Sequence, residues 1–295
     1  MRALFITFSV ALALHIPSAA QSPAWTADLA AIRATAALMP GARPLRINVV
    51  KFAESRRTKN FSVEGAASEP SVQARTAFQV VYPDGTVMVD AGMPLEVHRF
   101  FGRGVEEPYD AAAARQVDDA VGRARMIVLT HEHGDHAAGV ITGRRAAAIA
   151  PKTLLTRDQV RVLVAAPQMP EIRLAPDLVA RYRVVDYDMY MPAAPGMALI
   201  KSGGHTPGSQ MVYVTLSSGQ EVLLVGDVTW HMDGVRQVKG KDAPWVSEDR
   251  EAVLAQLAWL NGLSKTEPRL LIVASHDEEQ RLDLIRRQLL GDGFE

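Results

Sequence analysis

An apolar run leads directly into the motif THEHGDHAAG at residues 130–139, which holds three histidines and an aspartate within six positions. The run before it, RMIVLT, predicts a buried β-strand that ends at the motif. Alternate side chains of an extended strand end point the same way, so His131 and His133 can face one cation. A turn after them would direct Asp135 and His136 toward a second cation. In a helix His131 and His133 would lie about 200° apart, which disfavours joint binding of a metal.

Four other apolar runs also end in a short turn that carries a histidine or an aspartate. In α/β sheets the loops at the strand ends form the ligand crevice, so these side chains are expected to meet. Taken singly, each has an ordinary structural explanation, such as a turn histidine, a helix-start histidine or a turn-forming aspartate. Together and in one chain they favour a metal site. The residues are Asp90, His205, Asp227 and His276.

The chain contains no cysteine, so any metal ligand must be a histidine, aspartate or glutamate. Ligation by imidazoles and carboxylates suits Zn²⁺, although Fe or Mn could occupy the same site. Two cations that share a water molecule lower its pKa, and the resulting bridging hydroxide can attack a carbonyl carbon or a phosphorus. The pattern therefore predicts metal-assisted hydrolysis.

The motifs H-x-H-x-D-H, G-H-T-P-G, G-D and S-H-D occur in the order typical of the metallo-β-lactamase superfamily, which this chain resembles between Asp90 and His276. The resemblance implies an α/β fold, a four-layer αββα sandwich with a two-metal site at one edge of its paired sheets. It also implies a role for each residue. His131, His133 and His205 would bind the first metal, Asp135, His136 and His276 the second, Asp227 would bridge both, and Asp90 would orient a ligand imidazole.

Three local matches, VDAGMP, GHTPGSQ and SHDEEQ, are similar to the N-acyl-homoserine lactone lactonases, which open a lactone ring in quorum quenching. We therefore expect an ester-type bond as the target, with a lactone favoured, and Asp135 as the group that relays a proton to the leaving group. One position departs from this pattern. Those lactonases carry a tyrosine three residues after the bridging aspartate, where this chain has Trp230, a candidate on the substrate side. An indole N–H donates a hydrogen bond but exchanges no proton at neutral pH.

Other activities use the same scaffold and remain alternatives. A β-lactamase or a phosphodi- or phosphotriesterase would use the same site, although cysteine-dependent β-lactamases are excluded. An iron-dependent sulfur dioxygenase belongs to another reaction class, and a metal-binding protein without activity is a third option. Flavodiiron enzymes carry glutamate where His133 stands and are disfavoured. The apolar segments 166–176 and 189–197 could border an acyl-chain pocket or reflect ordinary loop packing.

The first 20 residues have the features of a secretory signal: Arg2, an apolar run and small residues before a cleavage site after Ala20. We expect residues 21–44 to form a connector with a short helix and residues 45–295 one hydrolase domain. The protein is then exported, either periplasmic or secreted, with no membrane association after the signal is removed. A net charge of −1 without a basic run disfavours a nucleic-acid partner and leaves a small-molecule substrate. The sequence does not indicate an oligomeric state.

Several local features make further expectations. Pro83-Asp84-Gly85 predicts a hairpin turn between two strands. Ser247 is the expected N-cap of a helix over residues 247–263, and Asp277 with Gln280 has the spacing of a capping pair. His98 and His231 match no ligand position and are expected at the surface or in a pocket.

Overall fold

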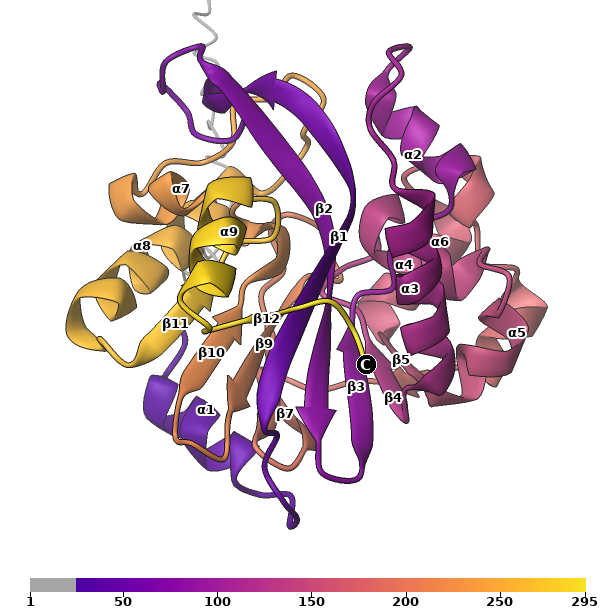
Figure 1. Ribbon diagram of the computed structural model, residues 1–295, viewed down its shortest axis with the longest axis vertical. Coiled ribbons are helices and arrows are strands. Elements are labelled where there is room, and N and C mark those ends of the chain that lie inside the picture. The colour runs from indigo at the N-terminus through magenta and orange to yellow at the C-terminus, as the bar shows by residue number, and fades with distance from the viewer. Residues whose placement is uncertain (1–24) are drawn as a thin grey trace, which may run out of the picture.

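The computed structural model describes residues 25–295, so the predicted signal peptide lies outside the described residues. The described strands form two sheets that face each other in the middle of the molecule (Figure 1). The seven-stranded sheet has the order β12-β1-β2-β3-β4-β5-β6, with β1 (Arg46–Thr58), β2 (Pro70–Tyr82), β3 (Gly85–Val89), β4 (Met126–Val128), β5 (Thr153–Thr156), β6 (Arg183–Val185) and β12 (Gly291–Asp292). The five-stranded sheet has the order β11-β10-β9-β8-β7, with β7 (Tyr190–Ala194), β8 (Met197–Lys201), β9 (Gln210–Thr215), β10 (Glu221–Leu224) and β11 (Leu270–Val273).

Helices cover the outer faces of both sheets (Figure 1). The α-helices are α1 (Leu29–Ala36), α2 (Leu95–Gly102), α3 (Ala111–Arg123), α4 (Gly134–Ile141), α5 (Ala146–Ile149), α6 (Arg157–Ala165), α7 (Met232–Gln237), α8 (Arg250–Thr266) and α9 (Glu278–Arg286). Short 3₁₀ helices are η1 (Lys59–Phe61), η2 (Ala150–Lys152), η3 (Pro170–Ile172), η4 (Pro176–Arg181) and η5 (Gly226–Val228). No described helix has the length and apolar character needed to cross a membrane.

Three hydrophobic cores separate four layers. One lies between the seven-stranded sheet and the helices from α2 to α6, and it includes Met88 and Leu129. A second fills the space between the two sheets, where Val80 and Val212 are fully buried. The third joins the five-stranded sheet to α1, α7 and α8 around Tyr213. Because each sheet is buried on both faces, its central strands are almost continuously apolar. The predicted four-layer αββα fold is confirmed.

The strand directions gather the polar turns at one edge of the sheets. Strands β3, β4, β5 and β6 run parallel in one sheet, and β10 and β11 run parallel in the other. Their carboxyl ends therefore reach a common region, as in other α/β sheets. The predicted hairpin is also present, because β2 and β3 pair antiparallel around residues 83–84.

The longest strands, β1 and β2, form an antiparallel ribbon that extends past the rest of its sheet (Figure 1). The register shifts between Lys51 and Ala53, and Ala53 then pairs with Arg75. A bulge of this kind bends the strand and re-aims the side chains beyond it. Here it accompanies the entry of the Arg75 side chain into the interior, where the residue is 6% exposed.

Two helix starts differ in detail from the expectation. The N-cap of α8 is Asp249, whose carboxylate accepts from Ala252 N at 3.0 Å, so the expected N-cap at Ser247 is wrong. Ser247 instead lines a pocket. Asp277 does cap α9 through Gln280 N, but the Gln280 side chain accepts from Ala274 N rather than returning to the cap.

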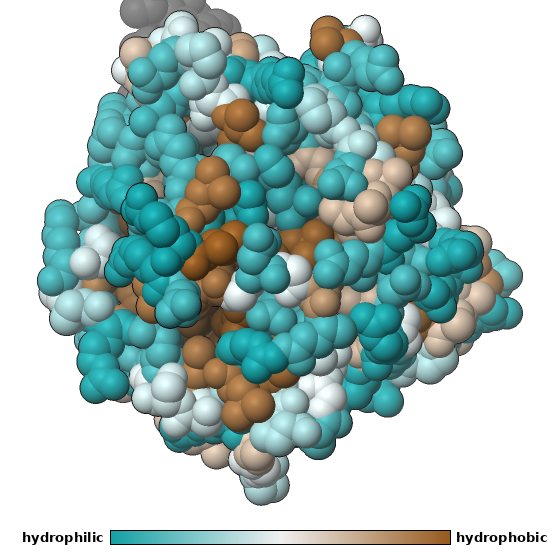
Figure 2. Space-filling model, in the orientation of Figure 1, coloured by the Kyte–Doolittle hydropathy of each residue, from teal (hydrophilic) through white to brown (hydrophobic). Residues whose placement is uncertain are grey.

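The segment 21–44 was expected to be a connector with a short helix. Its described residues, 25–44, contain α1, which packs on β7, β8 and β9 and buries Ile32 completely. Hydrophilic residues cover most of the visible surface, and hydrophobic ones gather near the middle of the same view (Figure 2).

Candidate metal centre

The THEHGDH motif lies between a strand end and a helix start. Strand β4 ends at Val128, and α4 begins at Gly134 with His133 as its N-cap. His131 and His133 therefore precede the helix, whereas Asp135 and His136 lie in its first turn. This helix start provides the change of direction expected of a turn at Gly134. A Cβ at Gly134 would lie 2.9 Å from Met169 Cε and Val97 Cγ1, so a larger residue would require these side chains to shift.

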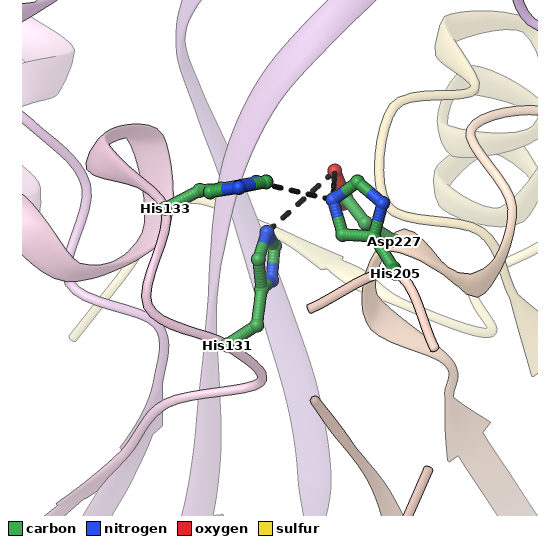
Figure 3. A group of neighbouring side chains, drawn as sticks. All are labelled: His131, His133, His205 and Asp227. Atoms are coloured by element: carbon green, nitrogen blue, oxygen red, sulfur yellow. Dashed lines mark hydrogen bonds and ion pairs between the residues drawn. The ribbon is translucent and has the colours of Figure 1, made fainter. Parts of the chain in front are cut away.

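Four side chains form the first group, and they point toward one another from both halves of the molecule (Figure 3). His205 Nε2 lies 3.1 Å from His133 Nδ1 and 3.4 Å from Asp227 Oδ2. His131 Nε2 lies 3.7 Å from the same Asp227 oxygen. The first group is thus His131, His133, His205 and Asp227, and the motif loop supplies only half of it.

The second group consists of Asp135, His136 and His276, all buried. His136 Nε2 and His276 Nε2 both lie 3.4 Å from Asp135 Oδ2. The other oxygen of Asp227, Oδ1, is 3.3 Å from His136 Nε2 and 3.1 Å from His276 Nε2. Asp227 therefore presents one carboxylate oxygen to each group, which is the arrangement that a bridging ligand needs.

The donor atoms fit metal ions. Ligands at about 2.0–2.2 Å from a tetrahedral centre lie roughly 3.3–3.6 Å from one another, which is close to the 3.1–3.7 Å distances given above. His131 Nε2 and His136 Nε2 are buried and have no hydrogen-bond partner among the described residues. An unpartnered buried nitrogen is costly unless a cation completes it. The structure thus brings together all seven side chains predicted as ligands.

Hydrogen bonds hold most of the imidazoles from behind. His136 Nδ1 lies 2.8 Å from Asp90 Oδ2, and His276 Nδ1 lies 2.6 Å from Ala74 O. Asp90 has a positive φ of 64° and also accepts from Thr130 N, so its backbone and side chain both support the site. Partners of this kind fix the ring orientation and the tautomer of a metal-binding histidine. Asp90 lies where the sequence predicted.

His205 is oriented by residues that the sequence analysis missed. Its Nδ1 lies 3.0 Å from Glu248 Oε2, and Lys241 Nζ lies 2.9 Å from the same oxygen. The Lys241 side chain is almost completely buried and also donates to Asp227 O at 2.7 Å. The loop before α8 also carries Lys239, which is exposed, so no local signal singled out Lys241, and its burial depends on packing.

Burial sets the protonation of the first group. It lowers the pKa of His131 well below the usual range and the pKa of His133 to about 3, which keeps both rings neutral and able to bind a metal. For Asp135, burial raises the pKa, but the positive charges of His136 and Arg75 outweigh it and hold the pKa well below its usual range. Asp135 is therefore ionised at neutral pH.

Trp230 contacts the bridging carboxylate. Its indole Nε1 donates to Asp227 Oδ2 at 2.7 Å, and Ser275 Oγ donates to Asp227 Oδ1 at 2.7 Å. The indole ring also lines the pocket, as expected of a residue on the substrate side. Its one donor is nevertheless directed to Asp227, so Trp230 orients a ligand.

A pocket of about 350 Å³ opens onto the two groups. Its wall combines aromatic rings with arginines, and the described lining residues are Arg57, Gln73, Arg75, Phe100, Phe101, Arg103, His133, Asp135, Gln168, His205, Asp227, Trp230, Trp245, Val246 and Ser247. Segment 166–176 contributes Gln168 to this lining. Segment 189–197 includes β7 and the first residue of β8 and contributes none of the described lining residues. No tyrosine is among them.

The two remaining histidines lie outside the groups. His231 lines a separate pocket beside Asp277, and its Nδ1 accepts from Asp233 N at the start of α7. A pocket was one of the two locations expected for this residue. His98 is 1% exposed and lies against Tyr109, with Nε2 3.2 Å from Glu107 O. The expectation of a surface or pocket position is wrong for His98, because α2 turns this face toward the core.

Comparison with known proteins supports the same family. The model of the metallo-β-lactamase superfamily matches residues 72–153, which include the motif loop but not His205, Asp227 or His276. An N-acyl homoserine lactonase of Bacillus thuringiensis is 22% identical over 210 residues, covering 67% of this chain and 78% of that protein.

Solved structures share the fold. An N-acyl homoserine lactone hydrolase, with the product N-hexanoyl-L-homoserine bound at its catalytic metal centre, superposes with a TM-score of 0.65 at 16% identity. The match covers 82% of this chain and 96% of that one. AidC, a dizinc quorum-quenching lactonase, superposes with a TM-score of 0.53 at 14% identity over 81% of this chain and 91% of that one.

Proposed function

We propose that this chain, which is similar to metal-dependent hydrolases of the metallo-β-lactamase superfamily, is a dinuclear zinc enzyme that hydrolyses an ester-type bond, with a lactone favoured. The observation that carries the proposal is the placement of Asp227. Its two carboxylate oxygens face two separate sets of buried donors, each spaced as ligands around one cation are. Fe or Mn would be held by the same donors.

His131, His133 and His205 would hold one cation, and Asp135, His136 and His276 the other, with Asp227 shared. When bound, two such cations supply a water of lowered pKa as nucleophile and electrostatic stabilisation of developing negative charge. The protein holds the ligands in place through Asp90, Glu248 and Trp230.

Asp135 is the proposed proton carrier to the leaving group. It lines the pocket and is ionised, so it can accept a proton during the reaction and pass it on. Its Oδ2 already accepts from Arg75 at 2.6 Å, which fixes the carboxylate in one orientation. The pocket wall of Phe100, Phe101 and Trp245 suits a substrate with an apolar part.

The lactone preference is supported by the relatives, which include N-acyl homoserine lactonases. A phosphodiester or phosphotriester is the second candidate, because three arginines line the pocket and a guanidinium binds phosphate oxygens well. Two of these arginines already pair with carboxylates, Arg57 with Glu107 and Arg75 with Asp135, so their positive charge is largely compensated. This favours the ester or lactone.

One experiment tests the function. The protein without its first 20 residues is purified, its metal content per chain is measured, and it is assayed on a lactone, a β-lactam, a thioester, a phosphodiester and a phosphotriester. We expect two zinc ions per chain and hydrolysis of the lactone above the others. Less than one metal per chain, with no hydrolysis of any compound, would reject the proposal, and oxygen consumption by an iron-loaded protein would favour a sulfur dioxygenase.

Asp227→Ala is the matched variant. It should lose activity together with part of the metal, because both groups share this carboxylate. Retention of two metals at unchanged affinity would rule out the bridging role.

Export is a separate part of the proposal. The signal pattern at residues 1–20 supports it. Expression of the full chain in a Gram-negative host, followed by fractionation and N-terminal sequencing, should find the protein outside the cytoplasm and beginning at Gln21. A protein retained in the cytoplasm with its first residues intact would contradict export.

A further inference from the structure

Arg75 brings a fixed positive charge to the second group. Its Nη1 donates to Asp135 Oδ2 at 2.6 Å and lies 3.3 Å from His276 Nε2. His276 Nε2 and His136 Nε2 each lie 3.4 Å from Asp135 Oδ2, a spacing typical of donor atoms around one metal. The guanidinium thus contacts two of the atoms that would bind the second metal.

The surroundings hold this guanidinium in place. Its Nη2 donates to Ser55 Oγ at 3.2 Å, and the ring of Phe101 lies 4.8 Å from its central carbon. The side chain is 7% exposed, so water screens its charge poorly. An arginine within the apolar strand β2 is unusual, because arginine is almost never fully buried unless it is paired. Here its carboxylate partner is Asp135, which is also a predicted metal ligand.

The first group has no comparable contact. Lys241, which lies beside this group, bonds to the backbone oxygen of Asp227 and pairs with Glu248. Its charge is therefore matched by a carboxylate that is not itself a metal ligand. Asp135, in contrast, must serve Arg75 and a metal with the same oxygen. The positive charge of Arg75 repels a divalent cation at the second group and competes for its only unshared carboxylate.

We propose that Arg75 makes the two metal sites unequal, so that the first group fills first and tightly and the second fills last and more weakly. Until the second metal arrives, Arg75 serves as the counter-charge of Asp135 and keeps that site formed. Arg75 is thus a positioning residue. The inference rests on the proposed two-metal function, but it concerns the order and strength of binding rather than the reaction.

The test is equilibrium dialysis of the metal-free protein, without its first 20 residues, against a series of Zn²⁺ buffers, followed by measurement of zinc per chain. The wild-type protein should bind zinc in two steps whose midpoints differ by about ten-fold or more. Two variants assign the steps. His133→Ala should remove the tight step, and His276→Ala should remove the weak one.

Arg75→Met is the decisive variant, because it removes the charge and keeps an apolar side chain of similar length. The affinity of the second step should rise on the order of 10- to 100-fold while the first step stays unchanged. The matched control is Arg103→Met, which removes another pocket arginine that stacks on Trp245 and has no bond to a ligand. It should leave both steps as they are.

Specific results would overturn the inference. If the wild-type protein bound two zinc ions in a single step, with equal affinity at the two groups, this result alone would overturn the inference. An Arg75→Met protein that is folded by circular dichroism, but whose second zinc ion binds with lower or unchanged affinity, would also overturn it. A purely structural role of Arg75 predicts such a lower affinity. Failure of the proposed function is distinct, because it would appear as no zinc at either group or as no hydrolysis by the zinc-loaded enzyme.

Discussion

The indole N–H of Trp230 donates to Oδ2 of Asp227 at 2.7 Å, on the carboxylate that both ligand groups share. At this position the lactonases that the sequence resembles carry a tyrosine. The tryptophan keeps a donor there, but it contributes no exchangeable proton to the substrate. The bond makes Trp230 a support of the metal centre as well as a part of the pocket wall.

Trp230→Phe should therefore weaken metal binding. The change removes the side-chain donor to Asp227 Oδ2 and leaves an aromatic ring, so this carboxylate keeps the bond from Ser275 to Oδ1 and is held less firmly. We expect a loss of about 10- to 100-fold in zinc affinity of the first group. The measurement is zinc dissociation with a chromophoric chelator, together with kcat and KM. Trp245→Phe, which changes the same pocket wall without touching a ligand, is the control. A Trp230→Phe enzyme with altered KM and unaltered zinc affinity would contradict the role.

The buried pair of Lys241 and Glu248 gives a second prediction. Glu248→Ala removes the carboxylate that bonds to His205 Nδ1 and leaves the buried ammonium of Lys241 unpaired. Loss of one partner of a buried ion pair costs about 3–5 kcal/mol. We expect a loss of this size in the free energy of unfolding, measured with urea, and weaker zinc binding. The double variant Lys241→Met with Glu248→Gln should recover much of the stability, because no unpaired charge remains. Equal destabilisation of both proteins would show that the charge is not the cause.

Asp90 supports the second group through an unusual backbone. Its φ is 64°, which asparagine and glycine tolerate better than alanine, and its carboxylate accepts from Thr130 N and faces His136 Nδ1. Asp90→Asn should fold normally but bind zinc at the second group about 10- to 100-fold more weakly. Asp90→Ala should also lose about 1–3 kcal/mol of stability from backbone strain and lost bonds. Zinc titration and thermal unfolding of both variants distinguish these effects, and equal melting temperatures would exclude the strain.

His98 predicts a pH dependence of stability. Burial lowers its pKa below the usual range, Arg75 lowers it further, and Glu107 and Asp135 act in the opposite direction. Because the unfolded histidine has the higher pKa, the unfolded chain binds more protons between the two values. The stability linked to neutral His98 is therefore fully present above the unfolded pKa of about 6.5 and is lost as the pH falls below it.

The variant His98→Gln keeps a side-chain donor for Glu107 O and cannot titrate. Urea unfolding of the metal-free proteins should show wild type losing stability relative to His98→Gln as the pH falls from about 7.5 to 5.5. A constant difference between the two proteins across this range would mean that His98 does not titrate there.

The sequence by itself determined the class of fold and the predicted ligands. Apolar runs that end in His131, His205, Asp227 and His276 are local patterns, and each needs only a few neighbouring residues to be recognised. The hairpin before Asp90 and the helix after Asp277 are local in the same way. The sequence did not determine the first residue of α8, because Ser247 and Asp249 are both good N-caps. The helix begins after Asp249 in the folded protein.

Only the tertiary structure decided how the ligands are supported and charged. Arg75 meets Asp135 from 60 positions away, and Glu248 meets His205 from 43. Trp230 is close to Asp227 in sequence, yet only the packed loop directs its indole to the carboxylate. The physical reason is that a hydrogen bond or ion pair depends on distances of about 3 Å between side chains, which are set by the packing of separate segments and not by the local pattern of either one.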